Sequence, residues 1–203
     1  GDYYYIDGDE AATAQIIYKL LTEMNIVIDK LIAESLYIGI STDTGSFQHS
    51  NTTSETHLIA AKLFERGIDH VKIIVNLYNN MSYKRIKLES EILSNMQLAA
   101  GGKVSVSYVT QDMLNRYDAV LEDCEGIVDT LKNIEGVEFA AFLKEKNGSV
   151  KVSMRAKSYG NVDKIAVKFG GGGHIKAAGC TLDIPMEKAV DLIKQELSNY
   201  WEN

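Results

Sequence analysis

The sequence predicts an α/β fold in two parts, a mostly helical first part and a second part in which a mixed sheet is flanked by helices. Three observations support this. Apolar residues recur at helical spacing across most of residues 14–78. The run Ala99-Ala100-Gly101-Gly102 interrupts that pattern, and residues 104–108 then alternate as a half-buried strand does. We therefore expect a first domain over residues 1–80, a linker helix within 81–102 and a second domain over 103–203.

The composition is that of a folded protein of 203 residues, with 45% hydrophobic and 24% charged residues. No apolar run approaches the roughly 20 residues needed to span a membrane. Cys124 and Cys180 lie far apart and belong to no metal-binding or disulfide motif. This cysteine usage favours a reducing compartment, and we expect a cytoplasmic location.

The first part is expected to contain one strand and four helices. The strand is predicted at Tyr3–Ile6, where aromatic and β-branched residues gather. Asp29 and Asp69 are good N-cap residues, and Thr52 with Glu55 has the spacing of a capping box. Together with the apolar periodicity, these signals predict helices over about 14–24, 29–40, 52–67 and 69–78.

The second part is expected to contain a hairpin, further strands and several helices. The turn Asn147-Gly148 predicts the hairpin, in which Lys151, Ser153 and Arg155 share one face of the second strand. Pro185 suits the start of the last helix. In chain order the expected elements are helix 81–96, strand 104–108, a helix from 123, strands 137–143 and 149–157, helix 162–168, strand 180–184 and a final helix after 185.

Four consecutive glycines, Gly170–Gly173, precede His174. Glycine loses much backbone entropy on folding, so such a run indicates close backbone approach or positive φ angles. Bare N–H groups beside an imidazole and the start of a short helix would suit an anion. A flexible hinge or a tight turn is the alternative interpretation.

The charge is distributed unevenly along the chain. The whole chain carries −7, whereas residues 144–176 hold eight basic and two acidic side chains, so that this window is +6 and the remainder is −13. A basic window beside the glycine run favours a local anionic ligand, although a solvated lysine face would give the same pattern.

Hydroxyl groups also gather around one carboxylate in Ser41–Phe47. Asp43 lies between Thr42 and Thr44, and Gly45 permits an unusual backbone angle. Such a loop suits a divalent cation or a phosphate, or else it simply terminates a helix. One carboxylate cannot hold a metal alone, and we interpret His49 and the other nearby histidines as surface or capping residues.

Three segments together resemble one family in order and spacing. Ser41–Phe47, Arg155 and Phe169–Gly179 closely resemble motifs of the DHH/DHHA1 phosphoesterases, and Ala12–Tyr18 is similar to the helix that follows the family's Asp-His-His. The branch that it most resembles is that of the oligoribonucleases and 3′-phosphoadenosine 5′-phosphate (pAp) phosphatases, often labelled exopolyphosphatase-related. The resemblance implies the C-terminal portion of a Rossmann-like DHH catalytic domain followed by a DHHA1 substrate-binding domain.

The resemblance also implies roles for individual residues. Asp43 matches a manganese ligand of a two-metal centre. Arg155 matches an arginine that contacts the terminal phosphate, with Ala156 where the family usually has Ser. The residues expected to bind the substrate's phosphate are Arg155, Gly171, Gly172, Gly173 and His174.

The remaining metal motifs of the family have no counterpart here. There is no Asp-His-His, no Asp-x-Asp near a histidine and no acidic metal motif before Asp43. In the family these motifs lie N-terminal to the matched region. We therefore expect the C-terminal part of a longer enzyme, which binds nucleotide phosphate weakly, holds no manganese pair and does not hydrolyse its ligand.

The expected function is the substrate-binding part of a manganese-dependent phosphoesterase acting on short oligoribonucleotides, pAp or both. Its partners would be short RNA or a mononucleotide bisphosphate, and the resemblance allows a homodimer. Alternatives are a cyclic-dinucleotide phosphodiesterase, a polyphosphatase, a RecJ-type exonuclease or a non-catalytic nucleic-acid-binding module like that of alanyl-tRNA synthetases. The acidic net charge disfavours a long-strand exonuclease, and the Asp43 loop disfavours the isolated module.

Overall fold

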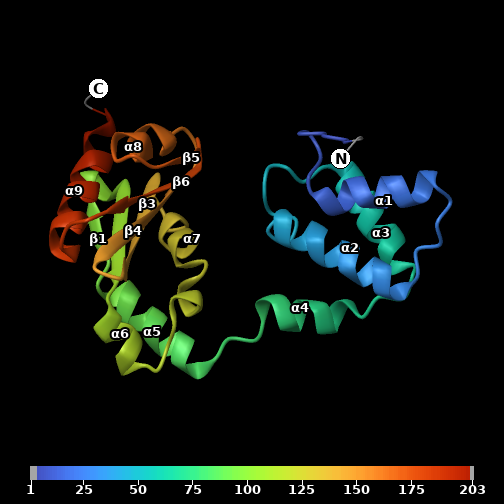
Figure 1. Ribbon diagram of the computed structural model, residues 1–203, viewed down its shortest axis with the longest axis horizontal. Helices are drawn as coiled ribbons and strands as arrows, with labels where there is room; N and C mark the ends of the chain where they lie inside the picture. The colour runs from blue at the N-terminus through green and yellow to red at the C-terminus, as the bar shows by residue number, and fades with distance from the viewer. Residues whose placement is uncertain (1–3, 202–203) are drawn as a thin grey trace. The chain divides into compact units, whose positions relative to one another are not determined.

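The computed structural model describes residues 4–201, which divide into two compact units, Gly1–Asn80 and Met81–Asn203 (Figure 1). Each unit has its own buried core. None of the helices within residues 4–201 combines the length and the apolar character that a membrane span requires.

The first unit is built of helices, as expected. Its core contains Leu36, Ile40 and Leu63, each no more than 6% exposed. Asp29 caps the second helix by accepting the Ile32 N–H at 2.9 Å, so that the capping prediction is confirmed. The helices are α1 (Thr13–Glu23), α2 (Lys30–Asp43), α3 (Ser54–Phe64) and α4 (His70–Tyr78).

Two local predictions for this unit are wrong. Residues 4–6 of the expected first strand are not in a strand, because a strand needs a hydrogen-bonding partner and none of the described residues pairs with them; Tyr3 lies outside the described residues. The capping box is formed by Thr53 and Thr56, one residue after the expected pair. Glu55 instead forms an ion pair with Lys19 at 2.8 Å.

The second unit contains a six-stranded sheet in the order β1-β2-β3-β4-β6-β5. Strands β2 and β3 are parallel and all other neighbours are antiparallel, which confirms the expected mixed sheet flanked by helices. The elements are α5 (Tyr83–Ser94), β1 (Gln97–Ala99), β2 (Val104–Val109), α6 (Gln111–Arg116), α7 (Ile127–Lys132), β3 (Phe139–Lys146), β4 (Ser149–Ala156), α8 (Asp163–Lys168), β5 (Gly172–His174), β6 (Ala177–Leu182) and α9 (Met186–Ser198).

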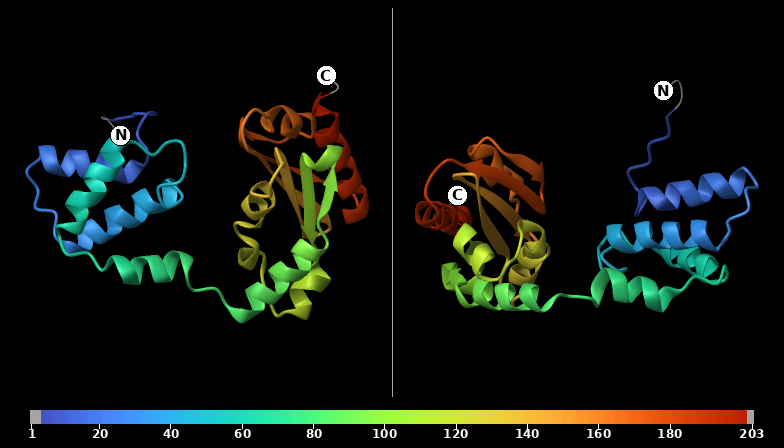
Figure 2. Two further views of the ribbon diagram at one scale, coloured as in Figure 1. Left: turned by 180° about the vertical axis from the view of Figure 1, so that it is seen from behind. Right: turned by 60° about the horizontal axis from the view of Figure 1, so that its bottom comes forward.

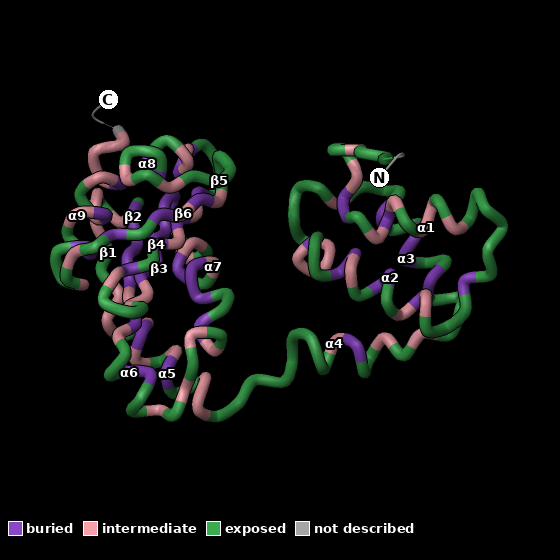
Figure 3. Tube along the Cα trace, in the orientation of Figure 1, coloured by how far each residue is buried: buried purple, intermediate pink, exposed green. Residues whose placement is uncertain are grey.

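Helices cover both faces of this sheet, so residues Phe139–Leu143 of β3 and most of β2 are buried on both faces and not on one side alone (Figures 2 and 3). Helices α8 and α9 pack against one face, and α5, α6 and α7 against the other. Ser105 and Ser107 of β2 are consequently buried. Their hydroxyls donate to the carbonyls of Leu131 (3.1 Å) and Ile92 (2.5 Å), which satisfies both polar groups.

Other boundaries in this unit differ from the sequence prediction. Helix α5 belongs to the second unit, in which Leu88 and Ile92 are fully buried. The helix expected from Asp123 begins at Ile127, after a short 3₁₀ turn. The predicted strand 180–184 is β6 at 177–182, because its ladder with β4 begins at Ala177.

Candidate phosphate-binding site

Strand register brings two of the expected site residues into one row across the sheet. Arg155 of β4 lies opposite Ala177 of β6, and Ala177 lies opposite His174 of β5. Directly opposed residues of antiparallel strands project to the same face. Arg155 and His174 therefore share a face, with their Cα atoms two strand spacings, or about 10 Å, apart.

Small residues fill the space between these two side chains. The next row consists of Ser153, Gly179 and Gly172. His174 and Gly172 are exposed, and the remaining residues are partly exposed. This surface, which we call the open face, has a shallow floor of small residues with a guanidinium and an imidazole on its rim. The open face comprises Ser153, Arg155, Gly172, His174, Ala177 and Gly179.

The first glycines of the run end helix α8. The Gly170 N–H donates to the Val167 carbonyl at 3.1 Å, and the Gly171 N–H donates to the Ala166 carbonyl at 3.0 Å. With Gly170 at φ 70°, this is the Schellman arrangement that closes a helix C-terminus. These two N–H groups are therefore engaged within the fold.

The Gly173 N–H is also engaged, because it donates to the Asp163 carboxylate at 2.8 Å. The expectation that bare N–H groups of the run would hold an anion is therefore wrong for Gly170, Gly171 and Gly173. The run is also followed by a turn and strand β6, not by a short helix.

The fold requires glycine at two of these positions, because a side chain would not fit there. A Cβ on Gly171 would lie 2.1 Å from the Gly179 carbonyl oxygen, and one on Gly173 would lie 2.5 Å from the Ala177 carbonyl oxygen. Both distances are far shorter than an ordinary van der Waals contact. Glycine at these positions lets the run lie directly against β6, which fixes the place of His174 at the sheet edge.

Arg155 is held at the other side of the open face. Its Nη1 donates to the Met154 carbonyl at 3.1 Å, and its Nε lies 3.7 Å from the Asp129 carboxylate on α7. Lys132 also bonds that carboxylate at 2.8 Å. The guanidinium carries five N–H donors, so donors remain available for a bidentate contact with phosphate.

A buried carboxylate supports the loop beside the open face. Glu138, 4% exposed, accepts the backbone N–H groups of Ser158, Tyr159 and Gly160 and the Ser158 hydroxyl at 2.7–3.2 Å. Burial raises the pKa of Glu138, but these hydrogen bonds outweigh burial and hold it below the ordinary value. Lys176, in the turn between β5 and β6, donates to the carbonyls of Ser158 and Gly160. Glu138 thus anchors the turn that follows β5.

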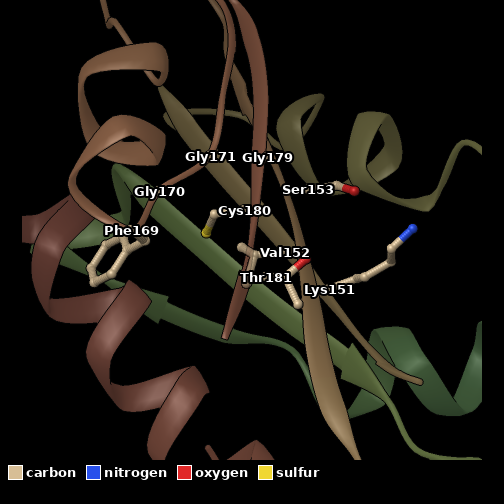
Figure 4. Close-up of a pocket in the computed structure, with 9 residues that line it drawn as sticks. All are labelled: Lys151, Val152, Ser153, Phe169, Gly170, Gly171, Gly179, Cys180 and Thr181. Carbon is tan, nitrogen blue, oxygen red and sulfur yellow. The ribbon is translucent and has the colours of Figure 1, made fainter. Parts of the chain in front are cut away.

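A cleft of about 400 Å³ adjoins the floor (Figure 4). In this view the side chains of Lys151 and Ser153 extend to one side, away from Cys180 and Phe169. The side chains of Lys151, Ser153 and Thr181 have no hydrogen-bond or ion-pair partner among residues 4–201, so their polar groups are available to a ligand. The lining residues are Lys151, Val152, Ser153, Phe169, Gly170, Gly171, Gly179, Cys180 and Thr181.

The loop around Asp43 belongs to the first unit and has a different character. Asp43 is the exposed last residue of α2. Three of the hydroxyls near it are already hydrogen-bonded within the unit: Ser41 to the Tyr78 hydroxyl (3.0 Å), Thr42 to the Ile38 carbonyl (3.0 Å) and Thr44 to the Ile40 carbonyl (2.7 Å). They behave as helix-terminating groups and are not arranged as ligands.

The backbone after Asp43 is unusual. Gly45, Ser46 and Phe47 all have left-handed φ angles, of 54°, 56° and 65°. For Ser46 and Phe47 this costs on the order of 1 kcal/mol each. The Ser46 N–H donates to the Ser41 carbonyl at 2.7 Å, and the Phe47 N–H donates to the Thr44 hydroxyl at 3.1 Å, which stabilises the turn.

The residues present do not fit a two-metal centre. Among residues 4–201, no group of three or more His, Cys, Asp or Glu side chains is placed to hold a metal ion. His57 stacks on Phe47 with ring centroids 5.2 Å apart, and His70 packs on Phe64 at 4.9 Å. These two histidines therefore have packing roles.

Sequence reasoning missed the carboxylates that shape the site. Asp163 fixes Gly173, Asp129 orients Arg155 and Glu138 fixes the loop before α8. Each acts on a residue at least 10 positions away in the chain, so no local motif marks it. Burying a carboxylate such as that of Glu138 is costly unless hydrogen-bond donors lie nearby. This cost is the signal that comes nearest to indicating the role of Glu138.

Comparisons with known proteins agree with this architecture. Residues 98–200 match the DHHA1 domain, so the chain belongs to that family. It is 31% identical to the bifunctional oligoribonuclease and PAP phosphatase NrnA of Thermus thermophilus over 98% of this chain and 61% of that protein. It is 29% identical to the Bacillus subtilis protein of the same name over 90% of this chain and 58% of that one.

A solved structure extends the similarity to the fold of the whole chain. The exopolyphosphatase-related protein from Bacteroides fragilis matches with a TM-score of 0.89 and 29% identity, over 98% of this chain and 62% of that one. The chain thus spans less than two thirds of the length of these three proteins. The family expected from the sequence motifs is confirmed.

Proposed function

We propose that the second unit binds the phosphate of a short oligoribonucleotide or of pAp, as the substrate-binding part of a phosphoesterase. The observation that carries this proposal is the row His174–Ala177–Arg155 across three strands, above a floor of small residues. A guanidinium and an imidazole are the groups that hold phosphate in proteins, and the small residues leave room for it.

The roles of the site residues follow from their positions. Arg155 would make a bidentate contact with the terminal phosphate, and His174 would donate to the same group from the sheet edge. Gly171, Gly172 and Gly173 would contribute by bringing the backbone close to the ligand, with Gly171 and Gly173 packed on β6. The names of the relatives from Thermus thermophilus and Bacillus subtilis, which pair an oligoribonuclease with a PAP phosphatase, support this choice of ligand.

We further propose that this chain alone does not hydrolyse its ligand. Asp43 is an exposed carboxylate without a cluster of further ligands among the described residues, which supports the proposal that this chain does not hold two manganese ions. The expectation that Asp43 is one ligand of a two-manganese centre in a longer enzyme stays a prediction.

Isothermal titration with pAp, without added divalent metal, tests the binding site. We expect His174→Ala and Arg155→Ala to lower the affinity at least about tenfold, since each removes charge-assisted hydrogen bonds. His70→Ala, a histidine that packs on Phe64 in the first unit, is the control and should bind as the wild type does. Equal affinity in all four proteins would contradict the assignment.

A further inference from the structure

Two lysines face each other directly on the sheet. Lys144 of β3 lies opposite Lys151 of β4 in an antiparallel pair, so both side chains project to the same face as Arg155. Neither lysine forms an ion pair with any described residue. Like charges directly opposite each other destabilise a sheet. The fold therefore retains an unfavourable pair that an anion would relieve.

The cleft described above is lined by one member of this pair, Lys151. Thr181 of β6 lies opposite Lys151, and Ser153 is the next residue of β4 on the same face. Both hydroxyls are without a partner among residues 4–201. An ammonium group with two free hydroxyls around a cleft of about 400 Å³ provides donors for one further anionic group.

This cluster is separate from Arg155 but lies on the same strand. Four residues along β4 correspond to about 13–14 Å between the Cα atoms of Arg155 and Lys151. One phosphate does not bridge that separation, whereas successive phosphates of a short nucleic-acid chain do. The floor between them, Ser153 and Gly179, carries no large side chain that would block the path.

We propose that Lys151, assisted by Lys144, Ser153 and Thr181, forms a second anion subsite for another phosphate of a short oligonucleotide whose first phosphate lies at Arg155 and His174. This inference rests on the proposed function and deepens it. It makes the open face a binding track for an oligonucleotide of a few residues, with single nucleotides occupying the Arg155 end alone.

Titrations with AMP and with the 5′-phosphorylated trinucleotide pApApA, in EDTA, test the second subsite. We expect Lys151→Gln to weaken pApApA binding about fivefold or more and to leave AMP binding unchanged. Lys164→Gln is the matched control, because Lys164 is an exposed lysine of the same basic window on helix α8, whose core contacts lie on the other face of the sheet. It should change neither affinity.

Two further readouts separate a binding role from general electrostatics. The affinity for pApApA should decrease less steeply with salt in Lys151→Gln. The magnitude of the slope of log affinity against log salt concentration should be smaller by about 0.7, as expected for one lost phosphate contact with a single strand. The melting temperature of the ligand-free protein should rise by about 1–3 °C, because the variant relieves the repulsion between Lys144 and Lys151.

The outcomes also distinguish the two proposals. If Lys151→Gln binds both ligands as the wild type does, or if Lys164→Gln weakens pApApA equally, the second subsite is wrong while the Arg155 site stands. If wild-type protein binds neither ligand, or Arg155→Ala has no effect on AMP, the proposed function itself is wrong.

Discussion

Two regions of this chain show similar sequence signals and very different structures. At the Asp43 loop, the hydroxyls of Ser41, Thr42 and Thr44 are hydrogen-bonded within the first unit, and Thr44 alone bonds both the Ile40 carbonyl and the Phe47 N–H. The second unit engages the N–H groups of Gly170, Gly171 and Gly173 internally, but it leaves Lys151 and His174 exposed and Arg155 partly exposed. Binding capacity therefore depends on which polar groups remain unpaired after folding, and not on how many polar residues a loop contains.

The largest effect should come from filling the space between the glycine run and β6. Gly171→Ala places a Cβ 2.1 Å from the Gly179 carbonyl oxygen, a backbone atom that cannot move aside cheaply. We expect a loss of about 3 kcal/mol or more in the free energy of unfolding of the second unit, together with loss of pAp binding. Urea denaturation monitored by circular dichroism measures the first effect.

Gly172→Ala is the matched control for that substitution. The nearest atom to its new Cβ would be an Asp163 carboxylate oxygen at 3.7 Å, an ordinary contact. Its stability should stay within about 0.5 kcal/mol of the wild type. Similar losses in the free energy of unfolding in both variants would contradict the explanation that Gly171 is needed because it lies so close to β6.

The next effect concerns the carboxylate that anchors the loop beside the open face. Glu138→Gln replaces a carboxylate that accepts from four donor groups of Ser158, Tyr159 and Gly160 with an amide whose NH₂ group is itself a donor. We expect a loss of about 2 kcal/mol in the free energy of unfolding. Weaker pAp binding should accompany it, because Lys176 bonds the same loop. An unchanged denaturation midpoint would contradict the anchoring role.

The same carboxylate predicts a pH dependence of stability. The folded-state pKa of Glu138 lies below its ordinary value of 4.5, so its contribution is present at neutral pH and is lost as pH falls below about 4.5. Urea midpoints between pH 3 and 7 should therefore decline less steeply on the acid side in Glu138→Gln than in the wild type. Parallel curves for the two proteins would contradict this.

The smallest effect should come from the Asp43 loop. Thr44→Val removes a buried hydroxyl that bonds the Ile40 carbonyl and accepts the Phe47 N–H, which should cost the first unit about 1 kcal/mol. Affinity for pAp should not change, because the proposed phosphate contacts lie in the second unit. A tenfold loss of pAp affinity in a folded Thr44→Val protein would contradict the division between the two regions.

The sequence predicted most of the elements and the family, since helical periodicity, the Asp29 cap and the Asn147-Gly148 turn act locally. It also placed Arg155 and Lys151 on one strand face by alternation alone. It did not predict the role of the glycine run, because only the strand register shows that Gly171 packs on β6 and that Asp163 occupies the Gly173 N–H. Nor did it predict burial of Ser105, which depends on helices far along the chain.

We propose that phosphate binds on the open face of the second unit and not at the Asp43 loop. Backbone amide chemical shifts in a ¹⁵N-labelled sample, titrated with pAp without divalent metal, test it most directly. We expect the largest shifts at Ser153, Arg155, His174 and Gly179, and little change at residues 41–47. Largest shifts at residues 41–47, with the sheet residues unmoved, would contradict it.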